Sequence, residues 1–112
     1  MAIELSKKIT KWGGGTISDI LGNILIKTQN GKLDWTWNHN VDDRFSCWST
    51  YFSGSSGKIV LYPIDRIIRI IVDDFMVTLI KGSSTDFEDR FDEIQSAIFE
   101  KKLQSKFFKI SE

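Results

Sequence analysis

The chain has 112 residues, 41% of them hydrophobic and 27% charged, and its 15 basic and 15 acidic side chains give a formal net charge of zero. This length and composition exclude an intrinsically disordered chain and predict one domain over residues 1–112, because the apolar residues can bury enough surface to offset chain entropy. The zero net charge argues against nucleic acid as a partner, since nucleic-acid binders carry an excess of positive charge that neutralises phosphates.

The N-terminal residues MAIELSKKITKW contain no uninterrupted apolar run, so we expect no signal peptide. The Ile-rich run at 64–72 contains Arg66 and Arg69 and is too short to span a membrane. Cys47 is the only cysteine, which excludes an intrachain disulfide and favours a cytoplasmic protein. The conformation of residues 1–22 stays open at this stage, as strand or as short helix.

The Asn-Gly pair at 30–31 lies between two runs that alternate in polarity. Asn-Gly favours a two-residue type I′ turn, because both residues tolerate positive φ, and so it predicts a β-hairpin. In this register Ile24 lies opposite Trp37 on an apolar face. Lys27 lies opposite Asp34 on the other face, as a favourable charge pair.

Two further turns are predicted at 39–43 and 53–57 from their loop-forming residues. The resulting registers place Trp35, Trp37, Phe45 and Cys47 on the apolar face with Tyr51. They leave Trp48 on the opposite face, directly across from Tyr62. A slip of one residue in either turn would exchange the two faces, because side chains alternate along a strand.

Residues 64–81 fit either a helix or a second hairpin. Their many β-branched residues, and the Asp73-Asp74 pair before an alternating run, favour the hairpin.

The C-terminal segment, about 86–104, is predicted to be a helix. Thr85 and Glu88 have the spacing of a capping box, and acidic residues lead while basic residues follow, as the helix dipole favours. One apolar stripe recurs at helical spacing and comprises Phe87, Phe91, Ile94 and Ile98.

Together these elements predict an α+β fold. It is an antiparallel meander of about five to seven strands within about 23–81, curled into a partial barrel or roll and closed by one C-terminal amphipathic helix.

The residues that could carry chemistry are few. His39 is the only histidine and falls in a predicted loop, away from Cys47, so no catalytic pair is predicted. His39 with Asp42 and Asp43 gives too few ligands for a structural metal site, and we predict neither a metal nor a cofactor. An enzyme that uses His39 with Asp42 or Asp43 stays as a third functional hypothesis.

The aromatic residues outside the predicted core face are the candidate binding site. The predicted site comprises Trp48, Phe52 and Tyr62 as anchors with Lys27, Asp34 and Arg44 around them. Aromatic residues with charged neighbours are typical of protein interfaces, so the leading hypothesis is a non-enzymatic protein that binds a protein partner stoichiometrically, such as a viral or phage-type inhibitor or accessory factor. The alternatives are a small-molecule or nucleotide pocket lined by these aromatics, self-association into a homo-oligomer, and burial of the same face by another segment of the chain.

Overall fold

The computed structural model describes the backbone of residues 16–51 and 57–111 and the side chains of 16–51 and 57–104. The elements in chain order are α2 (Ile17–Gln29), β1 (Thr36–Asn38), the 3-10 turn η1 (Asp43–Phe45), β2 (Cys47–Tyr51), β3 (Lys58–Tyr62), β4 (Ile67–Val72), β5 (Phe75–Leu79) and α3 (Phe87–Ser111). Residues 1–15, which include the triple glycine, and Phe52 of the predicted site lie outside the described residues.

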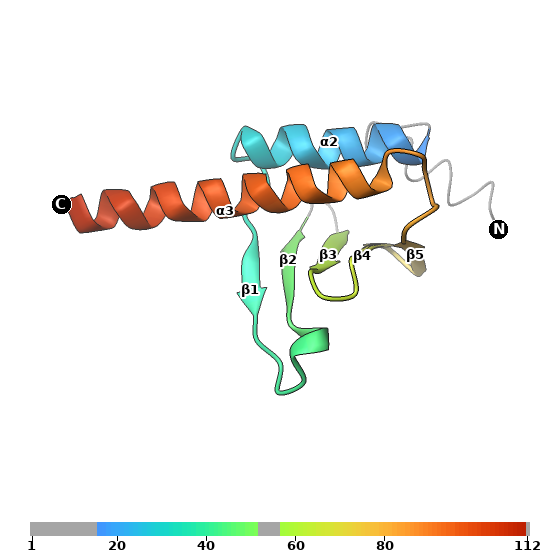
Figure 1. The fold of residues 1–112 in the computed structure, drawn as a ribbon, viewed down its shortest axis with the longest axis horizontal. Coiled ribbons are helices and arrows are strands. Elements are labelled where there is room, and N and C mark those ends of the chain that lie inside the picture. Colours follow the sequence, from blue (N-terminus) through green and yellow to red (C-terminus); the bar gives the residue numbers. More distant parts are fainter. Residues whose placement is uncertain (1–15, 52–56, 112) are drawn as a thin grey trace.

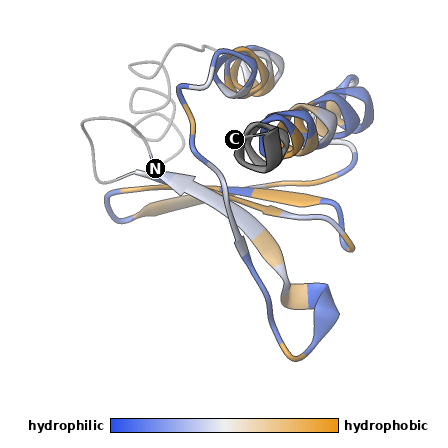
Figure 2. Ribbon diagram, turned by 90° about the vertical axis from the view of Figure 1, so that its left-hand side faces the viewer, coloured by the Kyte–Doolittle hydropathy of each residue, from blue (hydrophilic) through white to orange (hydrophobic). Residues whose placement is uncertain are grey.

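The five strands form one antiparallel sheet in the order β1-β2-β3-β4-β5, which confirms the predicted α+β meander with an unclosed sheet. Helices α2 and α3 lie on the same face of this sheet. Figure 2 shows this arrangement in a view nearly along the helix axes. They run side by side in the same direction across the strands, and the C-terminal part of α3 extends past β1 (Figure 1). In the described part of the chain no helix is long and apolar enough to cross a membrane.

The predicted hairpin at 30–31 is wrong, because the segment before it is the helix α2. Thr16 caps this helix by accepting a hydrogen bond from the Asp19 N–H at 3.1 Å. Gly31, with φ of +73°, ends it: the Lys32 N–H donates to the Lys27 carbonyl at 2.9 Å, which is the bond of a Schellman motif. Of the Asn-Gly pair only Gly31 has a positive φ, and it serves a helix end and not a hairpin turn.

Two strand registers also differ from those predicted. Trp37 pairs with Trp48, because the loop between β1 and β2 is longer than residues 39–43 and includes η1. Trp48 pairs with Leu61 instead of Tyr62, a shift of one residue. Each register differs from the predicted one by an odd number of residues. Trp48 therefore moves to the helix-covered face, and Tyr62 stays on the other face.

The C-terminal half agrees with the sequence. β4 and β5 form the predicted hairpin, with Asp73 at φ of 53° in its turn. α3 begins at Phe87, one residue from the predicted start at about 86, and extends beyond the predicted end at about 104 to Ser111. The Glu88 carboxylate, predicted to belong to a capping box, accepts a hydrogen bond from Nε of Arg66 in the β3–β4 turn at 2.8 Å.

The hydrophobic core lies between the two helices and the covered face of the sheet. The predicted stripe on α3 is fully buried, with each of its four residues at most 1% exposed. It packs with a stripe on α2 and with one row of side chains across the sheet; these comprise Ile20, Leu21, Ile24, Leu25, Trp48, Leu61, Ile68 and Leu79. Trp35 joins this core after α2 and donates from Nε1 to the Thr28 hydroxyl at 3.0 Å, which fixes where the chain enters β1.

The two glycines of the α2 region form a matched test of the helix end. We expect Gly31→Ala to lower the free energy of unfolding by about 1 kcal/mol or more, because a Cβ is disfavoured at positive φ. Gly22→Ala, inside α2 with nothing within 4 Å of an added Cβ, should raise it by about 0.5–1 kcal/mol. Urea unfolding of both variants measures this, and a similar effect of the two substitutions would contradict the assigned helix end.

Candidate binding site

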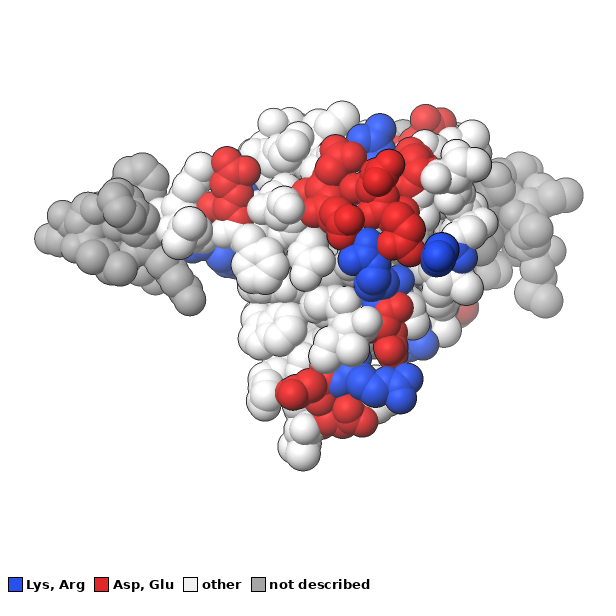
Figure 3. Space-filling model, in the orientation of Figure 1, with Lys and Arg blue, Asp and Glu red and all other residues white. Residues whose placement is uncertain are grey.

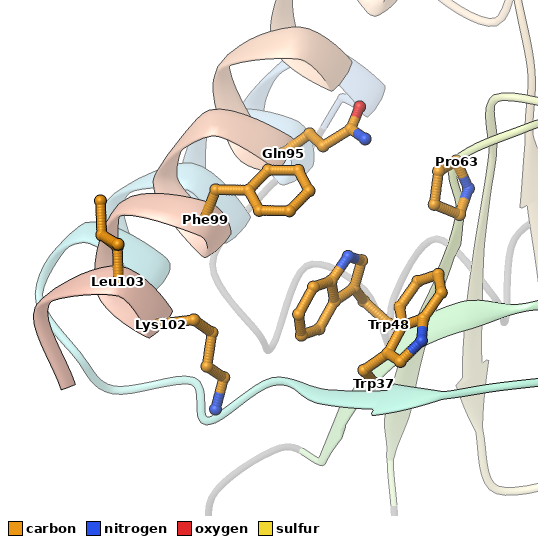
Figure 4. Close-up of a pocket in the computed structure, with 7 residues that line it drawn as sticks. All are labelled: Trp37, Trp48, Pro63, Gln95, Phe99, Lys102 and Leu103. Atoms are coloured by element: carbon orange, nitrogen blue, oxygen red, sulfur yellow. The ribbon is translucent and has the colours of Figure 1, made fainter. Parts of the chain in front are cut away.

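A pocket of about 500 Å³ opens between α3 and the first strands of the sheet (Figure 4). The sheet side of the pocket is lined by Trp37 of β1, Trp48 of β2 and Pro63 after β3. The helix side is lined by one face of α3, with Gln95, Phe99, Lys102 and Leu103. Most of this lining is apolar. Its volume lies within the range typical of pockets that hold a small ligand or an anchoring side chain.

Three aromatic rings shape the pocket. The Trp37 and Trp48 ring centroids lie 5.1 Å apart with an interplanar angle of 56°, and those of Trp48 and Phe99 lie 5.9 Å apart at 86°. Trp48 is at the centre and only 9% exposed, whereas Trp37 and Phe99 are 45% and 54% exposed. Trp48 therefore forms the buried floor of the pocket, and Trp37 and Phe99 are the two rings that an incoming group can reach.

Trp48 brings an unsatisfied donor to this floor. Its Nε1–H is buried and finds no hydrogen-bond acceptor among the described residues. Figure 4 shows this nitrogen facing the space between Gln95 and Pro63. A buried donor without a partner lowers stability, so an acceptor on a bound molecule would be favoured at this position.

Ion pairs border the pocket at both ends. At one end the Lys102 ammonium, whose stem lines the pocket, lies 3.1 Å from the Asp34 carboxylate. At the other end Arg66, in the turn between β3 and β4, stacks over the Phe91 ring at 4.5 Å and pairs with Glu88 and Asp92 of α3. The first contact connects α3 to the segment before β1, and the second connects α3 to the β3–β4 turn.

The structure does not gather the residues of the predicted site. Trp48 lines the pocket on the covered face, but Tyr62 lies on the opposite face, where the Arg69 guanidinium stacks 5.4 Å from its ring. Lys27 is on α2 and not on a strand across from Asp34. Arg44 is in η1 and pairs with Asp65 at 3.4 Å.

The residues of the alternative catalytic hypothesis lie in the loop between β1 and β2. His39 is exposed, and the Asp42 carboxylate accepts a hydrogen bond from the Arg44 N–H as the cap of η1. Within the described ranges, 16–51 and 57–111, no group of three or more His, Cys, Asp and Glu side chains could hold a metal ion. The loop geometry thus accounts for Asp42 as a structural residue.

The pocket residues of α3 were not predicted from the sequence as part of a binding site. Gln95, Phe99 and Leu103 recur every four residues, beside the buried stripe, so they form a second row on the same helix. Phe99 and Leu103 are 54% and 69% exposed, which is unusual for adjacent large apolar residues. The only sequence signal was this second row, once the first stripe had been assigned to the core.

Comparison of the chain with protein-family models, with curated proteins and with solved structures finds no match in any of the three.

Trp35 and Trp48, which are both buried, allow a matched stability test. Trp35→Phe removes a hydrogen bond that is made, whereas Trp48→Phe removes a donor that lacks a described partner. Because both substitutions delete the same atoms, we expect Trp35→Phe to cost at least about 1 kcal/mol more in the free energy of unfolding. Urea denaturation measures the difference, and equal losses would mean that the Trp48 N–H is satisfied in solution.

The thiol of Cys47 should react slowly. Burial raises the pKa of this thiol, and the Lys58 ammonium only partly offsets that effect. A raised pKa leaves less thiolate at a given pH, so alkylation by iodoacetamide near pH 8 should be slower than in the urea-unfolded chain. Lys58→Ala should slow it further; an equal rate in the folded and unfolded chains would contradict the burial of Cys47.

Proposed function

We propose that this chain is a non-enzymatic binding protein that holds an apolar side chain of a protein partner in the pocket of Trp37, Trp48 and Phe99. The observation that supports this function is the combination of an apolar aromatic pocket with the unsatisfied Trp48 N–H at its floor. An anchor residue would fill the apolar volume, and a carbonyl oxygen of the same segment would accept the Trp48 hydrogen bond. Buried aromatic pockets of this kind are where the binding energy of protein interfaces concentrates.

The proposal keeps the stoichiometric mode of action and the cytoplasmic location expected from the sequence, and it changes the site. Trp48 is retained from the predicted site, with Asp34 at the border through Lys102. Tyr62, Lys27 and Arg44 are not part of the proposed site, because none of them lines this pocket. The free Cys47 is compatible with a reducing compartment.

A small apolar ligand is the second candidate occupant. The volume of about 500 Å³ and the apolar lining favour it. It would quench or shift the fluorescence of Trp37 and Trp48 without any peptide present, which separates it from the leading proposal.

Selection from a random peptide library tests the leading proposal. Peptides that bind the wild-type chain should share one large apolar residue, and Phe99→Ala or Leu103→Ala should weaken them by about tenfold or more, as loss of an anchor contact of 1–2 kcal/mol implies. Ile26→Ala is the matched control, because Ile26 is an exposed aliphatic residue on α2, 53% exposed, that does not line the pocket.

Each variant should keep its far-UV circular dichroism, so that loss of binding is not loss of fold. Peptides without a common apolar residue, or affinities that Phe99→Ala and Leu103→Ala leave unchanged, would overturn the proposed function.

A further inference from the structure

The first two turns of α3 and the residue before them carry an acidic surface next to the pocket. The acidic surface comprises Asp86, Glu88, Asp89, Asp92 and Glu93. Arg66 bridges two of these carboxylates, at 2.6 and 2.9 Å, and Arg90 bridges two at 3.4 Å. Five carboxylates against two guanidinium groups leave three negative charges, and Figure 3 shows the carboxylates as one continuous patch.

Folding alone explains only part of this charge. Acidic residues in the first turn of a helix interact favourably with the helix dipole, and the Asp86 carboxylate also accepts hydrogen bonds from Ser18 and Ser84, at 2.7 and 2.8 Å. The effect of the dipole falls off within one turn, so for Asp92 and Glu93 the folded chain offers only their ion pairs with Arg66 and Arg90. The side chains of Asp92 and Glu93 are 64% and 49% exposed and remain available to a partner despite their ion pairs.

The acidic surface is continuous with the wall of the pocket. Glu88, Asp92, Gln95 and Phe99 follow one another at helical spacing of three or four residues, and the last two line the pocket. A segment anchored between Phe99 and Trp48 that continues toward the start of α3 therefore passes over Asp92. At the opposite end of the pocket the charge is balanced locally by the pair of Lys102 with Asp34.

The charge is beside the pocket and not inside it. No carboxylate lines the pocket, and its one charged lining residue is Lys102, so the anchor itself should be uncharged. The unsatisfied Trp48 N–H points independently to a ligand at this place. A neutral anchor followed by positive charges matches both features.

We infer that the partner presents its apolar anchor on a basic segment, with Lys or Arg residues that lie over Asp92 and Glu93. This inference rests on the proposed function and specifies the class of partner. Phosphates of nucleic acids and of anionic membranes would be repelled by the same surface, so a basic segment of a protein is the occupant that fits.

Library selection against two forms of the full chain tests the inference. The forms are the wild type and the double variant Asp92→Asn/Glu93→Gln. Asp73→Asn/Asp74→Asn removes the same number of charges at the β4–β5 turn and is the matched control. Peptides selected by the wild type and the control should be enriched in Lys and Arg on one side of the apolar anchor, and those selected by the double variant should keep the anchor and lose that enrichment.

A selected basic peptide should bind the wild type at least about tenfold more weakly when NaCl rises from about 50 mM to about 500 mM, because salt screens exposed charges. The same peptide should lose only about threefold on the double variant over that range. Anchored peptides with no charge preference, or equal salt dependence in both forms, would overturn the basic-segment inference and leave the pocket proposal standing. Basic peptides without an anchor would instead overturn the proposed function, since charge alone would then explain binding.

Discussion

The pairing of Trp37 with Trp48 is the constraint on which the rest of the site depends. Residues directly opposite in an antiparallel pair share a face, so this register puts both indoles beneath α3. A shift of one residue between β1 and β2 would turn Trp37 to the other face and leave Phe99 without its aromatic counterpart across the pocket. The hydrogen bond from Trp35 to Thr28 supports the register from outside the sheet, because it fixes the start of β1 against α2.

Helix α3 contributes one row of side chains to the core and a neighbouring row to the pocket. Its buried row, with Phe91 and Ile94 at 0% exposure, completes the core, and the second row, with Phe99 and Leu103, stands over the end of the sheet near β1. Figure 1 shows that α3 continues past β1, the edge strand of the sheet. The pocket lies at this edge, between the second row of α3 and the indoles of Trp37 and Trp48.

Sequence reasoning succeeded in the C-terminal half of the chain. The α3 stripe was predicted from its helical spacing, and the β4–β5 hairpin was predicted because its many β-branched residues favour a strand where the apolar spacing also fits a helix. It failed at 30–31, because Asn-Gly provides positive φ for a hairpin and equally for a helix end, and the helical recurrence of Ile17, Ile20 and Ile24 was not weighed against it. It failed again at Trp48, because the number of residues in a loop decides the face of every later side chain, and the η1 turn that lengthens the loop has no clear sequence signal.

The placement of α3 after β1–β5 in the sequence has a consequence for biosynthesis. The core side chains of α2, such as Leu21 and Ile24, pack against residues such as Phe91 and Ile98, which are made about seventy residues later. Closing such a long loop carries an entropic cost that no local contact offsets during translation. The covered face of the sheet therefore stays partly exposed to other chains or to chaperones until residues 87–98 have left the ribosome, and the core is completed only after all five strands have been synthesised.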